Sequence, residues 1–534
     1  MYFMKKHSEQ IIATVAFVFF ILITCYELTG SSLWYDEAIE YWYSKIMVGE
    51  LPMAGVADGT VSMYQRILLT YQPPLYNIIM YFWLKVSDSE LWFRSFGVFM
   101  GLVGMMGTYK SVRKVVNGWA ASLTVICAAT IYQLYSYWQE CAEYCLVLAV
   151  LCWVVYFWIC LMQEINFKNM ICFTVTCVVA VYSQYGAIFP VVALAFIAYI
   201  HILWRRNRRN AICINATYMS AFLFAAIPLY CFFLKQQIMH QRMERNSILI
   251  PQFPDGILLD FFESLNTTFY WNFFSYIYDQ TRVRNILIAI MVLLTVSLIF
   301  GKQTITKLMI LANVLCWLVY YVAVKFGIYS YGNFGRRYNL FFIPLWIVLF
   351  TVVCGDICLI LSDILRTRIY KIPLLKGIFM VTCLCFLCYY TVFNWTGKLR
   401  FHAYKSDIRG SVQEWYGQAA YEEATIVYYA AVPGFAYYVR QNEYYDEHTE
   451  EGVSYMAWLR DLNVDGYTSF VEAVYGTEWP EKVYIVASNY VEDLDTLAEC
   501  FTRKGYVRED LYDLHAGKLI YLFRADKGSG ILDL

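Results

Sequence analysis

The chain has 534 residues, of which 60% are hydrophobic and only 16% are charged. This balance excludes a soluble globular protein of this size and predicts a polytopic membrane protein. The net charge of −1 provides no basic field, which excludes nucleic acid as the expected partner.

The first hydrophobic helix is predicted over about Ile11 to Thr29. Lys5 and Lys6 precede it and no small-residue cleavage site follows, which indicates an uncleaved signal anchor with a cytoplasmic N-terminus. Ten further spans are expected because each segment approaches the roughly 20 residues that cross a bilayer core. They lie at about 93–110, 117–136, 143–163, 169–184, 186–204, 212–233, 284–300, 305–324, 338–361 and 373–393.

Basic clusters fix the expected topology, because positively charged loops stay in the cytoplasm. The clusters are Lys110-Arg113-Lys114, Arg205-Arg206-Arg208-Arg209, Lys302-Lys307 and Arg366-Arg368-Lys371. All of them lie inside only if the Pro-led apolar run 74–86 is a partial or interfacial helix. The result is a plasma-membrane protein with eleven spans, its N-terminus inside and its C-terminus outside.

With this topology the outer face receives the first outer loop 30–72, the long loop 235–283 and the tail from about residue 398. The tail is polar and predicts a small extracytoplasmic α/β domain, residues 398–534, beside a transmembrane domain of residues 1–397. Its expected strands are Thr425 to Ala430, Lys482 to Ala487 and Lys518 to Phe523, with a helix over Leu494 to Lys504.

Cysteine and histidine provide no sign of a disulfide framework or a metal centre. The polar tail contains only Cys500 of the 17 cysteines, which excludes a disulfide-stapled outer domain. The six histidines are scattered without metal-ligand spacing, so no metal site is predicted.

An acidic pair, Asp36-Glu37, follows the first span by a few residues. A carboxylate near low-dielectric lipid has a raised proton affinity, which suits a general base. The alternative is that both acids favour the first turn of an amphipathic helix over 36–48. Spacing alone leaves these two interpretations open.

Polar residues also gather at other expected outer turns. Arg336 and Arg337 open a span on the outer face, against the positive-inside trend, and a guanidinium fork there can hold a lipid-linked phosphate. Snorkelling to ordinary headgroups is the alternative for this pair and for Arg94. Gln139-Glu140 and Glu143-Tyr144 place further acids at a turn, where solvated loop residues are the plain interpretation.

Taken in order, these residues resemble the GT-C membrane glycosyltransferases of the protein O-mannosyltransferase and lipid A aminoarabinose transferase type. The resemblance runs from residue 30 to about 345. The matching elements are Asp36-Glu37, Gln72-Pro73-Pro74-Leu75-Tyr76, Arg94-Ser95, Gln139-Glu140-Cys141-Ala142-Glu143-Tyr144, Tyr182-Ser183-Gln184-Tyr185 and Arg337-Tyr338…Pro344. Two positions depart from the family, because Ala142 replaces its turn arginine and Gln184 its turn histidine.

The resemblance implies an all-α polytopic enzyme that moves a hexose or pentose from a polyprenyl-phosphate donor to an acceptor hydroxyl, with inversion. Asp36 would be the general base, beside Glu37 and Glu140 as further catalytic residues. The substrate-binding residues would be Gln72, Tyr76, Arg94, Gln139, Tyr144, Gln184, Tyr185, Arg336, Arg337 and Tyr338. No cofactor is required, although a divalent cation bound through Asp36 and Glu140 is left open.

The acceptor of such a reaction would be a lipid, a glycan or a protein, and the scarcity of outer cysteines suits a bacterial cell envelope. A transporter, a lipid-linked glycan flippase and a polysaccharide polymerase are the alternatives. The sequence lacks the inverted repeats of many transporters. A polymerase would usually centre its polar residues in a late outer loop.

Overall fold

The structure is a computed structural model. It describes residues 2–46, 68, 72–205, 208–238, 257–274, 280–329, 336–366, 380–385, 387–392, 394–395, 406–446, 448–456, 462–488, 494–514 and 516–524. The chain forms two compact units, and each is described by itself. Unit 1 comprises residues 1–26, 68–76 and 94–401, and unit 2 comprises residues 27–67, 77–93 and 402–534.

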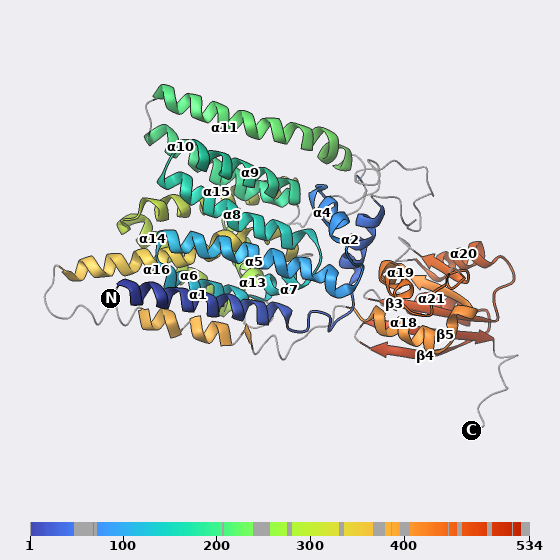
Figure 1. The fold of residues 1–534 in the computed structure, drawn as a ribbon. Helices are drawn as coiled ribbons and strands as arrows, with labels where there is room; N and C mark the ends of the chain where they lie inside the picture. Colours follow the sequence, from blue (N-terminus) through green and yellow to red (C-terminus); the bar gives the residue numbers. More distant parts are fainter. Residues whose placement is uncertain are drawn as a thin grey trace. The chain divides into compact units, whose positions relative to one another are not determined.

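Unit 1 is helical. Eight helices among the described residues are long and apolar enough to cross a membrane, which agrees with a multi-pass membrane protein. Figure 1 labels the helices α1 (Tyr2–Cys25), α5 (Glu90–Val115), α6 (Gly118–Ala129), α7 (Tyr132–Gln139), α8 (Glu143–Gln163), α9 (Phe167–Ser183), α10 (Ile188–Arg205), α11 (Arg208–Leu229), α13 (Ile257–Phe273), α14 (Gln280–Phe300), α15 (Thr304–Lys325) and α16 (Phe342–Arg366).

Shorter apolar helices lie at Gly118–Ala129, Phe167–Ser183 and Met380–Val392, within three more of the predicted spans. The exact count of eleven therefore stays a prediction. Helix α4 (Leu75–Trp83) has 9 residues, about 14 Å at 1.5 Å per residue, and is too short to cross a bilayer. This agrees with the prediction that the run 74–86 is only a partial helix.

The predicted span 117–136 is not one helix. Helix α6 ends before Thr130, whose hydroxyl donates to the Cys127 carbonyl at 2.9 Å. Ile131 is extended and precedes the separate helix α7. Thr130 and Ile131 are both β-branched, and the hydrogen bond from the Thr130 side chain to the backbone competes with a further helical turn. This accounts for the break.

The prediction that residues 235–283 form a loop is wrong in part, because this segment contains helix α13. Ser264, Thr268 and Asn272 are spaced by four residues and are all buried, at 3% exposure or less. This places a polar stripe inside the protein, where hydropathy does not reveal a helix. Phe269 and Phe273, also buried, pack against Trp346 of α16.

Unit 2 contains helix α2 (Tyr35–Ile46) and a C-terminal α/β region. The region comprises α18 (Ile408–Gly417), β1 (Ala424–Tyr428), α19 (Val432–Arg440), β2 (Val453–Met456), α20 (Val464–Tyr475), β3 (Lys482–Ser488), α21 (Leu494–Thr502), β4 (Tyr506–Leu514) and β5 (Gly517–Arg524). The strand order is β2-β1-β3-β5-β4, and Figure 1 shows this sheet from orange to red. Strand β1 is parallel to β2 and β3, whereas β5 is antiparallel to β3 and β4.

Alternation along β1 separates the two faces of this sheet. Ile426 and Tyr428 enter a buried core with residues of α20 and α21. Thr425 points to the other face, where its hydroxyl accepts a hydrogen bond from the Trp415 indole of α18 at 2.9 Å. Helices therefore cover both faces of the sheet, and the three predicted strands are joined by two that the sequence patterns did not reveal.

Candidate active site

The acidic pair opens helix α2 in unit 2. The Glu37 carboxylate accepts a hydrogen bond from the Trp34 backbone N–H at 3.4 Å, and its residue is 1% exposed. This is the capping contact that an acid at the third helical position makes. Asp36 is only half-buried, so Asp36 is the more accessible carboxylate of the pair.

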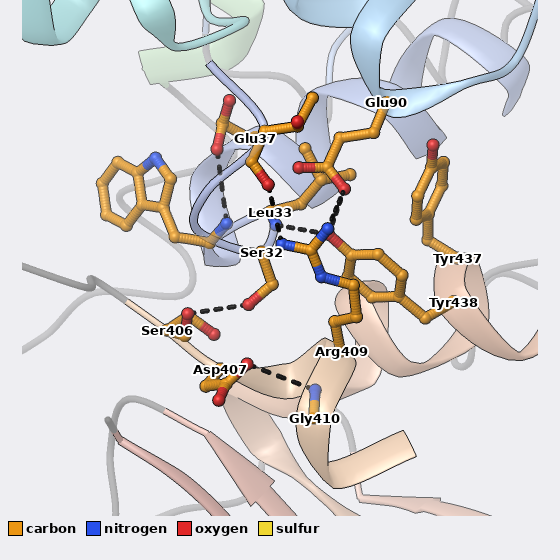
Figure 2. Close-up of polar contacts among 12 residues, drawn as sticks. Ser32, Leu33, Glu37, Glu90, Ser406, Asp407, Arg409, Gly410, Tyr437 and Tyr438 are labelled. Carbon is orange, nitrogen blue, oxygen red and sulfur yellow. Dashed lines mark hydrogen bonds and ion pairs between the residues drawn. The ribbon is translucent and has the colours of Figure 1, made fainter. Parts of the chain in front are cut away.

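Residues of the C-terminal region hold the segment that leads into α2 (Figure 2). The contacts are side chain to backbone and therefore fix the path of the chain. Ser32 Oγ donates to the Ser406 carbonyl, Leu33 N to Tyr438 Oη, and Trp42 Nε1 to the Pro433 carbonyl, each at 2.7 Å. The helix that carries Asp36 is thus tied to α19 and to Ser406, two residues before α18, within one compact unit.

A carboxylate at the start of α5 completes this arrangement. Glu90 forms an ion pair with Arg409 at 3.5 Å, and Figure 2 shows the Arg409 guanidinium next to the Glu90 carboxylate. A second nitrogen of Arg409 donates to the Thr29 carbonyl at 3.0 Å. Arg409 therefore connects Thr29, just before the predicted first outer loop 30–72, to the start of α5. Residues 47–67 and 69–71 of that loop lie outside the described residues.

Glu40 is a buried acid on the same helix that the sequence interpretation did not single out. It is 5% exposed and accepts a hydrogen bond from the Asn77 amide of α4 at 2.8 Å. Glu37 and Glu40 are three residues apart, so they share one face of α2. The burial of both side chains shows that this face points inward.

In unit 1, a group of polar residues gathers around Glu143, the first residue of α8. Glu143 is 2% exposed, and its carboxylate is hydrogen-bonded by the side chains of Gln72 and Tyr144. The Tyr329 hydroxyl donates to the Tyr338 carbonyl at 3.2 Å. Burial raises the pKa of the Tyr329 phenol, and the nearby Tyr338 and Glu143 raise it further. We call these five residues the Glu143 cluster.

The Glu143 cluster brings together Gln72, Tyr144 and Tyr338, which the sequence places far apart. Glu143 itself was noted as a turn acid but was not predicted as a site residue, because its neighbour Glu140 matched the family pattern. Glu143 is the first residue of a long apolar helix, and this position is the sequence feature that indicates its burial.

The predicted turn Gln184-Tyr185 lies against this cluster. A methyl group on the next residue, Gly186, would collide with the Tyr329 hydroxyl. Tyr185 Oη donates to Gln237 Oε1 at 2.7 Å, and Gln237 Nε2 donates to the Gln72 carbonyl at 2.9 Å. Gln237 therefore links the turn to Gln72, a role that no sequence pattern indicated.

Gln184 stands where the resembled family has histidine. It is 7% exposed, and within the described part of the chain its Oε1 has no hydrogen-bond partner. A buried polar atom without a partner is rare and costly, which marks a position where a ligand can bind.

The basic pair lies in a short 3-10 helix, Arg336–Asn339, next to the cluster residue Tyr338. The Arg337 guanidinium lies 5.6 Å from the Tyr338 ring centroid and is half-buried. The side chain of Arg336 lies outside the described residues. A cation over an aromatic face beside acids and phenols can receive a charged phosphate.

Arg94 and Glu140 lie on facing segments of unit 1. Arg94 is 3% exposed and Glu140 is 6% exposed. Gly97, one turn after Arg94, packs so tightly that a methyl group there would lie 2.6 Å from the Trp138 carbonyl oxygen and 3.0 Å from that of Glu140. The Arg94 face of α5 therefore meets the turn that carries Glu140.

Gln139 and Tyr76 make contacts within the protein. Gln139 Nε2 donates to the carbonyls of Thr24 and Tyr26, at 3.0 and 2.7 Å, and so satisfies the C-terminal end of α1. Tyr76 is fully buried and its hydroxyl lies 3.2 Å from Cys141 Sγ. Their substrate-binding roles stay predictions.

The described residues contain no group of three or more His, Cys, Asp or Glu side chains that could hold a metal ion. The cation left open through Asp36 and Glu140 is not tested by this observation. The acidic pair belongs to unit 2 and the Glu143 cluster to unit 1.

Comparison with known proteins gives this arrangement a context. Residues 71–231 match the family described as dolichyl-phosphate-mannose-protein mannosyltransferase. Two solved structures of ArnT from Cupriavidus metallidurans share the fold. The undecaprenyl phosphate complex has 14% identity and a TM-score of 0.53 over 96% of this chain and 97% of that chain. The apo form has 12% identity and a TM-score of 0.56 over 97% and 98%. No curated protein matches significantly.

Proposed function

We propose that this chain is a membrane glycosyltransferase of the GT-C superfamily and that it moves a sugar from a polyprenyl-phosphate donor to an acceptor hydroxyl outside the cytoplasm. One observation carries the proposal. Of the acidic pair that opens α2, Glu37 is used in capping, whereas Asp36 is accessible. The family description and the lipid bound in the ArnT complex support a polyprenyl-phosphate donor.

Asp36 acts as the general base in this proposal. Its carboxylate takes the proton of the acceptor hydroxyl while the hydroxyl oxygen attacks the anomeric carbon of the donor sugar. The bond between that carbon and the phosphate oxygen breaks, and its electron pair leaves with the polyprenyl phosphate. A single displacement of this kind inverts the anomeric centre.

The departing phosphate requires positive charge, which Arg337 supplies, with Arg336 and Arg94 as further candidates. Preorganised charge at the position where negative charge develops is often the largest contribution to catalysis. Arg337 is half-buried, where its interaction with phosphate is stronger than in bulk water.

The Glu143 cluster is the proposed sugar subsite. A buried carboxylate, an amide and three phenols offer acceptors and donors at close range, and sugar hydroxyls need both. Gln184, with its unpartnered Oε1, extends this surface. The five residues of the cluster include no cation, so the cluster suits the uncharged sugar of the donor and not its phosphate.

Release of polyprenyl phosphate tests the reaction class. Purified protein is incubated with a panel of polyprenyl-phosphate sugars and candidate acceptors, and the lipid product is identified by mass spectrometry. We expect polyprenyl phosphate, whereas a polymerase would release a diphosphate and a transporter would leave the donor intact. Asp36→Asn should abolish the product. Asp465→Asn is the matched control, because Asp465 also lies in the first turn of a helix, α20, and is exposed.

A further inference from the structure

A separate cavity of about 320 Å³ lies in unit 1 at the ends of four helices. It is formed where α5, α8 and α10 end and where α15 begins. The basic loops at these ends are the ones that the positive-inside rule assigns to the cytoplasm. The lining residues are Lys114, Val115, Met162, Gln163, His201, Arg205, Gln303, Thr304, Ile305 and Leu308.

The lining is cationic and polar. Lys114 and Arg205 contribute two positive charges, and no acidic side chain is among the lining residues of the described chain. Both cations are exposed at the mouth of the cavity. Such a lining favours an anion.

His201 adds a buried acceptor. It is 3% exposed, and its Nε2 lies 3.1 Å from the Met162 carbonyl oxygen. Because a carbonyl can only accept, Nε2 carries the hydrogen and Nδ1 of the neutral ring is left as an acceptor. This Nδ1 is buried and has no hydrogen-bond partner within the described residues. A ligand with a hydroxyl group would satisfy it.

The start of α15 faces the same cavity. Its N-cap residue Gln303 makes no side-chain capping hydrogen bond. Asp356 holds the preceding turn, since its carboxylate accepts from Ser297 Oγ at 2.5 Å and from the backbone nitrogens of Lys302 and Gln303 at 3.3 and 3.4 Å. The Asp356 carboxylate offsets the partial positive charge of this helix N-terminus, so Lys114 and Arg205 supply the positive charge of the cavity.

An exposed tryptophan lies beside the cavity. Trp204, next to Arg205, is 75% exposed. Exposed tryptophan at the end of an apolar helix is typical of the interface between lipid and water. Basic pockets between spanning helices on the cytoplasmic side are known to receive anionic lipid headgroups.

We propose that this cavity binds an anionic phospholipid whose headgroup carries a free hydroxyl, the chemistry of phosphatidylglycerol. Lys114 and Arg205 receive the phosphodiester, and His201 Nδ1 accepts a hydrogen bond from the headgroup hydroxyl. A zwitterionic headgroup would bring its own cation against Lys114 and Arg205. This site is independent of the glycosyl transfer proposed above.

Lipid titration of delipidated protein by native mass spectrometry tests the site. The probes are phosphatidylglycerol, phosphatidylmethanol, which has the same charge without a hydroxyl, and phosphatidylethanolamine. We expect phosphatidylglycerol to bind best. The double variant Lys114→Ala/Arg205→Ala should lose roughly 10- to 30-fold in affinity, from two charged contacts. Arg113→Ala is the control, since Arg113 is exposed on the same turn but does not line the cavity.

His201→Phe separates the hydroxyl contact from the charge. In this variant, the affinity for phosphatidylglycerol should fall to that for phosphatidylmethanol. A thermal melting curve reports whether the protein tolerates the buried phenyl ring. Equal binding of those two lipids to the unaltered protein would overturn the proposal. So would an unchanged affinity in the double variant. Displacement of phosphatidylglycerol by millimolar inorganic phosphate would assign the site to a soluble phosphate instead of a lipid.

Discussion

The Tyr438 hydroxyl donates a hydrogen bond to the Glu90 carboxylate at 2.9 Å. The same hydroxyl accepts one from the backbone N–H of Leu33, three residues before Asp36. One phenol of helix α19 therefore fixes the chain just before α2 and also the first residue of α5. This gives the C-terminal region, which lies outside the family resemblance, a physical role as the support of the acidic pair.

Tyr438→Phe tests this support. The change removes one hydroxyl and keeps the ring, so we expect a loss of about 1–2 kcal/mol in stability and a clear fall in kcat with little change in KM. Tyr437→Phe is the control, because it removes a neighbouring hydroxyl of α19 that donates to the Asp88 carbonyl. Equal effects of both variants on kcat would show that Tyr438 has only a structural role.

The two acids of the pair should respond differently. Asp36→Asn removes the proposed proton acceptor and should lower turnover by roughly 10²–10⁴-fold at unchanged stability. Glu37→Gln weakens a helix cap and should lower stability by about 0.5–1 kcal/mol with a milder kinetic effect. Turnover and thermal unfolding of both variants provide the comparison. Loss of turnover in Glu37→Gln with a fully active Asp36→Asn would move the base by one position.

Arg337 should act on the donor. Arg337→Ala removes charge-assisted hydrogen bonds to the phosphate and should raise the donor KM by about tenfold or more, whereas the acceptor KM stays the same. Arg337→Lys should restore only part of the affinity, because an ammonium lacks the two-pronged geometry. Arg284→Ala, on an exposed position of α14, is the control. Unchanged donor KM in both Arg337 variants would indicate snorkelling to lipid headgroups.

Long apolar helices were predictable from the sequence because their windows carry enough hydropathy to cross a membrane. Helix α13 was not, since Ser264, Thr268 and Asn272 turn their polar side inward and lower the hydropathy of the window. Strand β4 was missed for a related reason. It lies at the edge of the sheet, and four of its nine residues are charged and five are exposed, which conceals the alternation of a buried strand.

The candidate site was predictable as a set of residues but not as a set of contacts. The sequence placed acids at 36 and 37, but only the packing of α2 shows that Glu37 points inward. The importance of Glu143 depends on Gln72 and Tyr329, which are distant in sequence. Gln237 lies in a segment without a motif, and its link between Tyr185 and Gln72 arises from tertiary structure alone.

Glu143→Gln tests the proposed sugar subsite. A neutral amide of the same shape loses charge-assisted hydrogen bonds to sugar hydroxyls, so kcat/KM should fall by roughly 10- to 100-fold. Stability should be equal or higher, because removing a buried charge also removes its desolvation cost. Glu164→Gln is the control, since Glu164 is exposed just after the other end of α8. A stable Glu143→Gln protein with the kcat/KM of this control would remove Glu143 from the site and leave the reaction class unchanged.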